Sequence, residues 1–257
     1  MANCYELITN HYNMFNIFKK RETKYLADYF KGEFTDIHSH LLPGIDDGAK
    51  DMNNSKELIS GLRAIGINKF ITTPHIIKNL HDNNREIIEN KRDELNLALN
   101  ENLSAAAEYM LDSYFFENVK SEKLLTLKEN YILIEMSYIN PPIQLFDIIF
   151  ELRLSGYKLI MAHPERYPFY FSKNFEDYKK LAENGCQFQL NLNSVFGYYG
   201  KAVQKVALDL LDQNMITYVG TDAHHHKHVH SLSSILPLDK KQNLALEKVI
   251  ENNKLFD

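Results

Sequence analysis

Tryptophan is absent from this sequence, cysteine occurs only twice, and no long apolar run is present. Cys4 and Cys186 are too few and too far apart for a disulfide framework or a cysteine zinc cluster, which suits a reducing compartment. No stretch approaches the roughly 20 apolar residues of a membrane span, and Met1–Phe30 lacks the apolar core of a signal peptide. We therefore expect a cytoplasmic protein without a transmembrane segment.

Basic residues do not exceed acidic ones. Lys and Arg number 29 against 34 for Asp and Glu, which gives a formal net charge of −5. Such a chain has no overall basic field to hold nucleic acid, so no nucleic-acid partner is expected. The sequence leaves the oligomeric state open.

The chain has 257 residues, of which 44% are hydrophobic and 25% are charged, enough for one large α/β domain with a substantial core. No linker, low-complexity tract or internal repeat indicates a second domain. We place an N-terminal extension at residues 1–32 and the main domain at residues 33–257. Residues 14–20 are mildly amphipathic, and we expect the extension to pack on the domain or to be partly disordered rather than to dock on a membrane or partner.

Short apolar, β-branched runs predict seven strands that alternate with helices. Gly66, Gly156 and Gly185 each stand between a predicted helix and the next strand, as αβ loops require. Strict alternation indicates a parallel sheet, and seven βα units favour barrel-like closure with functional groups at the carboxyl ends of the strands. The predicted strands are 34–38, 69–73, 105–110, 131–136, 158–162, 188–192 and 216–220, and the main helices are 53–65, 83–100, 143–154, 175–184 and 201–214.

A residue that can hold a metal ion lies at the end of nearly every predicted strand. In segment 36–40 the period of two places His38 and His40 on the same face of an extended chain. The sixth predicted strand offers Asn191 and Asn193 instead. Because coincidence would have to recur on six strands, the pattern predicts a metal centre. The candidate ligands are His38, His40, Asp47, His75, Glu108, Glu135, His163, Asp222 and His224.

These nitrogen and oxygen donors exceed the roughly four to six ligands of a single cation, so they would serve two or three ions that share a bridging carboxylate. Mixed imidazole and carboxylate donors suit manganese, iron or zinc, and the share of carboxylates favours Mn²⁺. A lone histidine such as His75 is more often a hydrogen-bonded structural residue. Glu108 and Glu135 lie in apolar runs, however, and a buried carboxylate without a cation is costly.

Two neighbouring cations that deprotonate a water and neutralise phosphoryl oxygens make phosphoester hydrolysis the natural chemistry. Arg166 offers a planar fork for phosphate oxygens, and its structural alternative is a salt bridge to Glu165 or Asp47. Aromatic residues in the loops 167–171 and 196–199 either flank an aryl group or pack locally. Beyond His224, the histidines of residues 225–230 are expected to be solvated loop residues.

Five strings in this sequence resemble the polymerase and histidinol phosphatase (PHP) superfamily, and within it the CpsB/CapC type of bacterial manganese-dependent protein-tyrosine phosphatase. The resemblance runs from about residue 34 to near the C-terminus. It implies a distorted (β/α)7 barrel with three metal ions at the C-terminal ends of the strands. It also implies a phosphotyrosine-bearing substrate, the tail of a tyrosine kinase that regulates capsular or exopolysaccharide synthesis. The strings are DIHSHLLPGIDDGA (36–49), TPH (73–75), ILIE (132–135), AHPER (162–166) and TDAH (221–224).

The resemblance further implies roles for individual residues. Arg166 would steady the equatorial oxygens of the phosphoryl group, and His40 or His224 would aid protonation of the leaving group. Asp47 is a further catalytic candidate. Glu108 would bridge two ions. By analogy the first ion takes His38, His40, Glu108 and Asp222, the second takes Glu108, Glu135 and His163, and the third takes Asp47, His75 and His224.

Two features set this chain apart from well-known patterns. A second arginine, which family members often place after the Asp-Ala-His string, is replaced by residues 225–230, where Lys227 offers only a point charge. The phosphate loop of cysteine-dependent tyrosine phosphatases has arginine six positions after its cysteine. Those positions hold Asn10 and Leu192 here, and Cys186 is expected to be a buried small residue.

Three other functions stay open at this point. The first is a small-molecule phosphomonoesterase of the histidinol-phosphatase type. The second is a noncatalytic scaffold that uses metal only to stabilise its fold. The third is a nuclease, which the acidic balance and the lack of a basic, aromatic-interleaved groove disfavour.

Overall fold

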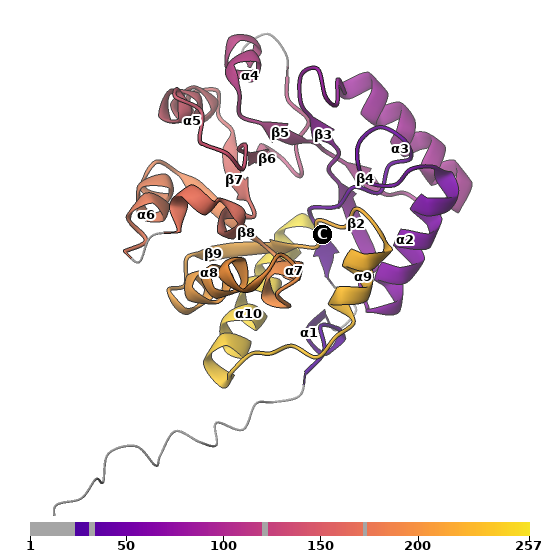
Figure 1. Ribbon diagram of the computed structural model, residues 1–257. Helices are drawn as coiled ribbons and strands as arrows, with labels where there is room; N and C mark the ends of the chain where they lie inside the picture. The colour runs from indigo at the N-terminus through magenta and orange to yellow at the C-terminus, as the bar shows by residue number, and fades with distance from the viewer. Residues whose placement is uncertain (1–23, 31–33, 120–122, 172–173) are drawn as a thin grey trace, which may run out of the picture.

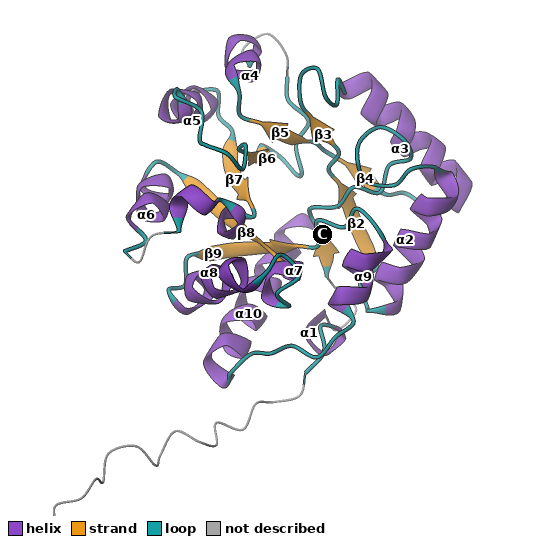
Figure 2. Cartoon of the chain, viewed as in Figure 1, coloured by secondary structure: helices purple, strands orange, loops and turns teal. Residues whose placement is uncertain are grey.

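The computed structural model describes residues 24–30, 34–119, 123–171 and 174–257, and most of the predicted N-terminal extension lies outside these ranges. Strands alternate with helices along the chain, and the helices surround the strands (Figures 1 and 2). The short helix α1 (Ala27–Phe30) packs on the domain, with Tyr29 and Phe30 buried. Within the described residues, no helix is both long and apolar enough to cross a membrane.

All pairings between the named strands are parallel, as the alternation of strands and helices predicts. One sheet has the order β1-β2-β4 and the other has the order β3-β5-β6-β7-β8-β9. A mixed α/β fold with parallel sheets is therefore confirmed. The strands are β1 (Thr35–Asp36), β2 (Lys69–Thr72), β3 (His75–Ile76), β4 (Ser104–Ala105), β5 (Glu108–Met110), β6 (Tyr131–Glu135), β7 (Lys158–Ala162), β8 (Cys186–Asn191) and β9 (Ile216–Gly220).

The boundary between the two sheets differs from the sequence prediction. The predicted strand 105–110 is divided into β4, which pairs with β2, and β5, which pairs with β3. Pro74 lacks a backbone N–H, so the chain cannot continue the β2 ladder through this residue and begins a new strand at His75. The Pro74 carbonyl still accepts a hydrogen bond from the Glu108 N–H at 3.1 Å, which keeps the two sheets in register.

Helices follow the strands as predicted, with ends that shift by one or two residues. Asp51 and Asn84 cap the N-termini of α2 (Met52–Ala64) and α3 (Arg85–Leu99) by accepting backbone N–H bonds, as short polar side chains do at this position. The other predicted helices are α5 (Leu145–Leu154), α6 (Glu176–Glu183) and α8 (Lys201–Asp212). The helices that the sequence analysis did not predict are α1, α4 (Ser113–Asn118), α7 (Leu192–Val195), α9 (His226–Leu232) and α10 (Lys240–Asn252).

Alternation along the parallel strands divides the apolar core into two layers. Leu133 on β6 and Ile160 on β7 belong to an inner cluster that also contains residues of β2 and β9. Their neighbours Ile134 and Met161 belong to the larger cluster between the strands and the helices. Because both faces of the strands are buried, strands such as β6 and β7 are largely apolar, and the candidate metal ligands gather where the strands end.

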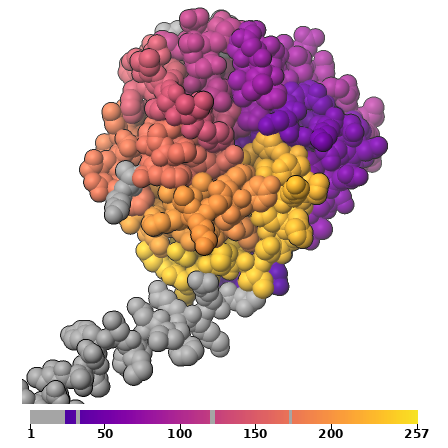
Figure 3. Space-filling model, viewed as in Figure 1, coloured from indigo at the N-terminus to yellow at the C-terminus, as the bar shows by residue number. Residues whose placement is uncertain are grey.

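The beginning and the end of the domain lie side by side. The side chain of Asn253 donates hydrogen bonds to the carbonyl oxygens of Thr35 on β1 and Val219 on β9, at 3.0 and 2.8 Å. In the space-filling view, segments coloured yellow border segments coloured indigo (Figure 3). This contact fixes the first and last strands relative to each other.

Replacing Gly220 with alanine is expected to destabilise the domain by about 1–3 kcal/mol, as overpacking does. A Cβ at this position would lie 2.6 Å from His38 Cβ and 2.9 Å from Gln189 Nε2. Urea denaturation measures the loss, and Ser60→Ala on the exposed surface of α2 is the control that should stay near zero. Equal stability of the two variants would contradict this close packing.

Candidate metal centre

The structure brings all of the predicted ligand residues together at the carboxyl ends of the strands. Every one belongs to at least one set whose ligand atoms lie within 4.8 Å of one another. His38 and His40 follow β1, Asp47 precedes α2, His75 follows β2 and begins β3, Glu108 follows β4 and begins β5, Glu135 ends β6, His163 follows β7, and Asp222 and His224 follow β9. Residues far apart in the sequence thus meet because parallel strands end at one edge.

The most buried set consists of His38, His40, Glu108 and Asp222. His38 Nε2 lies 3.2 Å from Glu108 Oε2 and 3.3 Å from Asp222 Oδ1. His40 Nε2 lies 3.4 Å from the same two oxygens and 3.3 Å from His38 Nε2. Two atoms bound at about 2.1 Å to one ion are about 3.0 Å apart at a right angle and about 3.4 Å apart in a tetrahedron. These spacings are therefore those of ligands around one ion.

A second set surrounds Glu135. His75 Nδ1 lies 2.8 Å from Glu135 Oε1 and 3.1 Å from Glu108 Oε2. His163 Nε2 lies 3.1 Å from Glu108 Oε1 but 4.0 Å from Glu135 Oε2. The structure thus groups Glu135 with His75 more closely than with His163, whereas the family analogy puts His163 beside Glu135 and His75 in another set.

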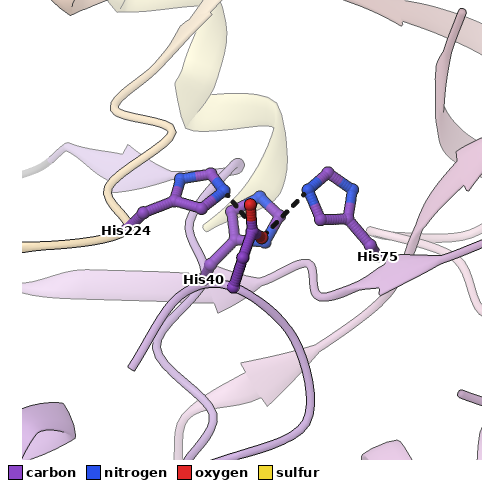
Figure 4. A group of neighbouring side chains, drawn as sticks. His40, His75 and His224 are labelled. Carbon is purple, nitrogen blue, oxygen red and sulfur yellow. Dashed lines mark ion pairs between the residues drawn. The ribbon is translucent and has the colours of Figure 1, made fainter. Parts of the chain in front are cut away.

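The third set lies at the outer edge of the centre. His75 Nε2 and His224 Nε2 each lie 3.4 Å from Asp47 Oδ1. Figure 4 shows the His75 and His224 rings turned toward a common point, with His40 beside it. The side chain of Asp47 is 61% exposed, against 12% for His75 and 13% for His224. Solvent and substrate therefore reach the centre from this side.

Several buried polar atoms of the centre have neighbours but no hydrogen bond. Glu108 Oε2, Glu135 Oε1 and His75 Nδ1 are all without a hydrogen-bond partner, although they lie about 3 Å apart. Buried carboxylate oxygens in native proteins are normally hydrogen-bonded or bound to a cation. The donor set therefore fits a divalent metal ion, and the described residues contain a His/Asp/Glu cluster capable of binding metal.

Two residues outside the predicted set orient the imidazole rings. Asp46 Oδ2 accepts from His40 Nδ1 at 2.8 Å, and Gln189 Oε1 accepts from His38 Nδ1 at 2.7 Å. Each bond puts the proton on Nδ1 and leaves the Nε2 lone pair directed at the buried set, which is how outer partners of metal-bound histidines act. The sequence analysis considered only Asp47 of the Asp46-Asp47 pair, and adjacent acidic residues in a metal-binding loop are the signal that could have identified Asp46.

The electrostatics of the centre favour anionic carboxylates. Burial raises the pKa of Glu108, but the neighbouring His38 and His75 rings hold the pKa well below its usual range. Burial likewise raises the pKa of Asp222, and His38 and His224 more than offset this effect. Burial lowers the pKa of His163, so this ring stays neutral with a lone pair available. Anionic oxygens and neutral nitrogens are the forms that bind metal.

Arg166 lies at the edge of the centre, on the short 3₁₀ turn η1 (Pro164–Arg166) that follows β7. Its Nη1 donates to Asp222 Oδ2 at 2.6 Å, and the side chain is 19% exposed. The structural alternative named either Glu165 or Asp47 as its partner, and the structure places the ion pair on Asp222 instead. Arg166 is thus paired with one of the buried carboxylates of the centre while part of its side chain stays exposed.

The prediction that the histidines of residues 225–230 are solvated loop residues holds only in part, because His226 and His230 are exposed but the stretch is mostly helical and His228 is buried. Residues 226–232 form α9, and His228 is only 6% exposed. Its Nδ1 lies 3.1 Å from the Asp222 carbonyl oxygen, and burial lowers its pKa to about 3. Val229 on the same helix lies against Gly61, so α9 packs on α2. A run composed mainly of histidine hides the periodicity that would have predicted this helix. Lys227 is exposed on α9.

Most aromatic residues after Arg166 pack locally. Tyr167 is fully buried, and Tyr170 is 8% exposed and packs against Tyr178. Two other tyrosines contact the guanidinium of Arg166, namely Tyr138 in the loop after β6 and Tyr199 before α8. The sequence analysis named Tyr199 only as part of a loop and did not consider Tyr138. Tyr138 could have been identified from the sequence as an aromatic residue just after a strand that ends in a candidate ligand.

The family of the chain follows from comparison with known proteins. The model of the family described as capsular polysaccharide synthesis, CpsB/CapC, matches residues 34–235. The chain belongs to the CpsB/CapC family. A putative tyrosine-protein phosphatase CapC from Staphylococcus aureus is 28% identical over 229 residues, which cover 86% of this chain and 89% of that protein. The tyrosine-protein phosphatase YwqE from Bacillus subtilis is 29% identical over 226 residues, which cover 85% and 89%.

Solved structures support the same family. The crystal structures of YwqE from Bacillus subtilis and CpsB from Streptococcus pneumoniae, metal-dependent tyrosine phosphatases, provide a match with a TM-score of 0.69 and 30% identity, covering 77% of this chain and 84% of that chain. A histidinol phosphate phosphatase from Lactococcus lactis matches with a TM-score of 0.50 at 13% identity, a likeness of fold alone. The resemblance to the CpsB/CapC type carried by the five strings is thus confirmed.

In this CpsB/CapC protein, Asp46→Asn is expected to weaken divalent-metal binding by about 10- to 100-fold, because the neutral amide orients the His40 ring less firmly. Isothermal titration of metal-stripped protein with Mn²⁺ measures the change. Asp82→Asn is the matched control, since it alters an exposed carboxylate paired with Lys78. Equal Mn²⁺ affinities in the two variants would show that Asp46 does not support the centre.

Proposed function

We propose that this chain is a metal-dependent protein-tyrosine phosphatase. The observation that supports the proposal most is the cluster of imidazoles and carboxylates with Arg166 at its solvent-facing edge, in a family whose relatives are tyrosine-protein phosphatases. The reaction is hydrolysis of a phosphoric monoester. A small-molecule phosphatase, a scaffold and a nuclease become alternative outcomes of the experiments below.

We assign the ligands to two or three ions. His38, His40, Glu108 and Asp222 would hold the most buried one, and their mutual spacings of 3.2–3.4 Å support this set. Glu108 and Glu135 would share a second ion with His163, His75 or both, and Asp47 and His224 would complete an outer position. Mn²⁺ is the proposed metal because oxygen and imidazole donors are mixed without a thiolate, and iron or zinc would also suit these donors.

When bound, divalent ions lower the pKa of a water molecule and neutralise the oxygens of a phosphoryl group. Arg166 would bind those oxygens with the guanidinium edge that Asp222 leaves free, as a planar fork does. His224 Nδ1 lies 2.9 Å from the Asp222 carbonyl oxygen and can only donate to it, which leaves Nε2 as a lone-pair ligand. His40 is held in the same state by Asp46.

These hydrogen bonds bear on the catalytic roles proposed for His40, His224 and Asp47. With Nδ1 engaged as a donor in both rings, Nε2 is the nitrogen that faces the centre, so we assign both residues to metal binding. Asp47, the most exposed ligand, would border the incoming phosphate. A tyrosinate leaving group needs little acid catalysis, because the pKa of the phenol is only about 10. Protonation of the product by solvent water is therefore sufficient.

We further propose that the strands close into a distorted (β/α)7 barrel. The Asp222 N–H donates to the His38 carbonyl at 2.7 Å, and the His40 N–H donates to the Ala223 carbonyl at 3.0 Å. These bonds connect the chain after β9 with the chain after β1 and support closure. The barrel domain would be residues 33–257, with residues 1–32 as an extension whose end packs on it through Tyr29 and Phe30.

The proposed substrate is a phosphotyrosine on another protein, the tail of a tyrosine kinase that regulates capsular or exopolysaccharide synthesis. The family description, capsular polysaccharide synthesis, supports this choice. A cytoplasmic location is proposed with it, because the chain has only two cysteines and a kinase tail is phosphorylated where ATP is available.

Turnover of a phosphotyrosine peptide is expected to vanish when the protein is stripped of metal and to return when Mn²⁺ is added. Thiol alkylation of the native protein is expected to change nothing, because Cys186 is buried and burial raises its pKa to about 12. Release of phosphate measures both effects. The Cys4→Ser/Cys186→Ser double variant is the control. Activity that survives chelation would overturn the proposal.

Arg166→Ala is expected to lower kcat/KM for the peptide by about 100-fold, the usual loss for a charged hydrogen bond to a transition state. Arg166→Lys should recover only part of it, since an ammonium is not a planar fork. Arg92→Ala on α3, which removes an arginine that pairs with Asp93 outside the metal centre, is the control. Preferential hydrolysis of a small phosphate ester over the peptide would favour the metabolite phosphatase instead.

A further inference from the structure

The guanidinium of Arg166 is held by two aromatic rings as well as by a carboxylate. Its Cζ lies 4.7 Å from the centre of the Tyr138 ring and 4.1 Å from the centre of the Tyr199 ring. Both distances are within the range of cation–π contacts, which are strongest where water is largely excluded. With Asp222 bound to Nη1 at 2.6 Å, three side chains from three different loops fix this one group.

Asn191 at the end of β8 joins two of these contacts. Its Oδ1 accepts from the Asn193 N–H at 2.9 Å, so the orientation of its amide is fixed. Its Nδ2 therefore donates, to Asp222 Oδ2 at 2.8 Å and to the Tyr199 hydroxyl at 3.1 Å. Arg166, Asp222, Asn191 and Tyr199 thus form a closed ring of contacts, in which displacement of one member strains the others.

An arginine on a loop normally loses considerable side-chain entropy when it binds phosphate. Here the rotamer is fixed in advance by the two rings and the carboxylate, while 19% of the side chain still faces solvent. Groups that are oriented before the substrate arrives contribute more to the transition state than groups that must be ordered during the reaction.

We propose that Tyr138 and Tyr199 are positioning residues, which hold the Arg166 guanidinium by its faces so that its free edge meets the phosphoryl oxygens. The inference rests on the proposed phosphatase function and deepens it. Tyr138 acts on Arg166 through its ring, and its hydroxyl lies 3.5 Å from His163 Nε2, too far for a strong hydrogen bond. Tyr199 acts through its ring and through the hydroxyl that accepts from Asn191. Neither residue is a metal ligand in any of the ligand sets.

The test is a double-mutant cycle on the metal-loaded protein. Tyr138→Leu and Tyr199→Leu, made singly, are each expected to lower kcat/KM for a phosphotyrosine peptide by about 3- to 30-fold, the range of one cation–π contact. In the Arg166→Ala background the same substitutions are expected to cost nothing further, because the group that they position is gone. The dissociation constant of inorganic phosphate, measured by calorimetry, should follow the same pattern without any turnover.

Conservative variants separate the two tyrosines. Tyr138→Phe keeps the ring face and should retain the wild-type kcat/KM. Tyr199→Phe loses the bond to Asn191, so its kcat/KM should lie between those of the wild type and Tyr199→Leu. Tyr114→Leu is the matched control, because Tyr114 has Lys78 over its ring at 5.1 Å outside the metal centre. It should leave both measurements unchanged.

Two results would overturn the proposal. One is a loss of equal size in the Arg166→Ala background, and the other is no loss in either leucine variant. If the wild type binds inorganic phosphate but does not hydrolyse the peptide, the proposed function fails. The double-mutant cycle measured through the dissociation constant of phosphate still decides whether the two tyrosines position Arg166. If Tyr199→Leu lowers the melting temperature or the metal content, Tyr199→Met replaces it in the cycle, because methionine fills similar space without a ring face. The loss caused by Tyr199→Met is then compared between the wild-type and the Arg166→Ala backgrounds.

Discussion

The centre depends on one constraint, the placement of three carboxylates in a region that water hardly reaches. Glu108, Glu135 and Asp222 are at most 1% exposed, and the only arginine or lysine paired with them in the described residues is Arg166, through Asp222. Isolated buried anions are too costly to persist, so positive charge has to come from protons on the imidazoles or from metal ions. The carboxylates raise the pKa of His38, which means that protons and metal ions compete for the same nitrogens.

The fold supports this concentration of charge by separating apolar from polar side chains along each strand. Residues within the strands, such as Leu133 and Ile134, fill an inner and an outer apolar layer. Residues just beyond the strands, such as Glu135 and His163, meet above the inner layer. Alternation explains the first arrangement, and the shared direction of the strands explains the second. Asp46 in the loop after β1 and Gln189 on β8 then fix the rings of His40 and His38 from behind.

Sequence patterns predicted the parts of this arrangement that depend on local periodicity. The strand 131–136 and its last candidate ligand, Glu135, follow from one apolar run, and the predicted helix 53–65 lies within one residue of α2 at each end. Contacts between distant segments were not predictable. The adjacent Asp46 and Asp47 mark the loop but do not show which of the two orients His40. The position of Tyr138 after a strand makes it a candidate but does not show that it contacts Arg166. The helix at His226 was missed because its buried side is defined by Gly61 on another helix.

The pairing of the chain after β1 with the chain after β9 has a consequence for biosynthesis. His38 leaves the ribosome early and Asp222 leaves it late, yet they share the most buried ligand set. In a nascent chain that has not yet reached β9, this ligand set is incomplete, because His38 and Glu108 lack the carboxylate of Asp222. Structures with such long sequence separation assemble slowly, and their partly formed states expose apolar edges. A polypeptide that has not been synthesised beyond Asp222 therefore cannot assemble the complete set of candidate ligands.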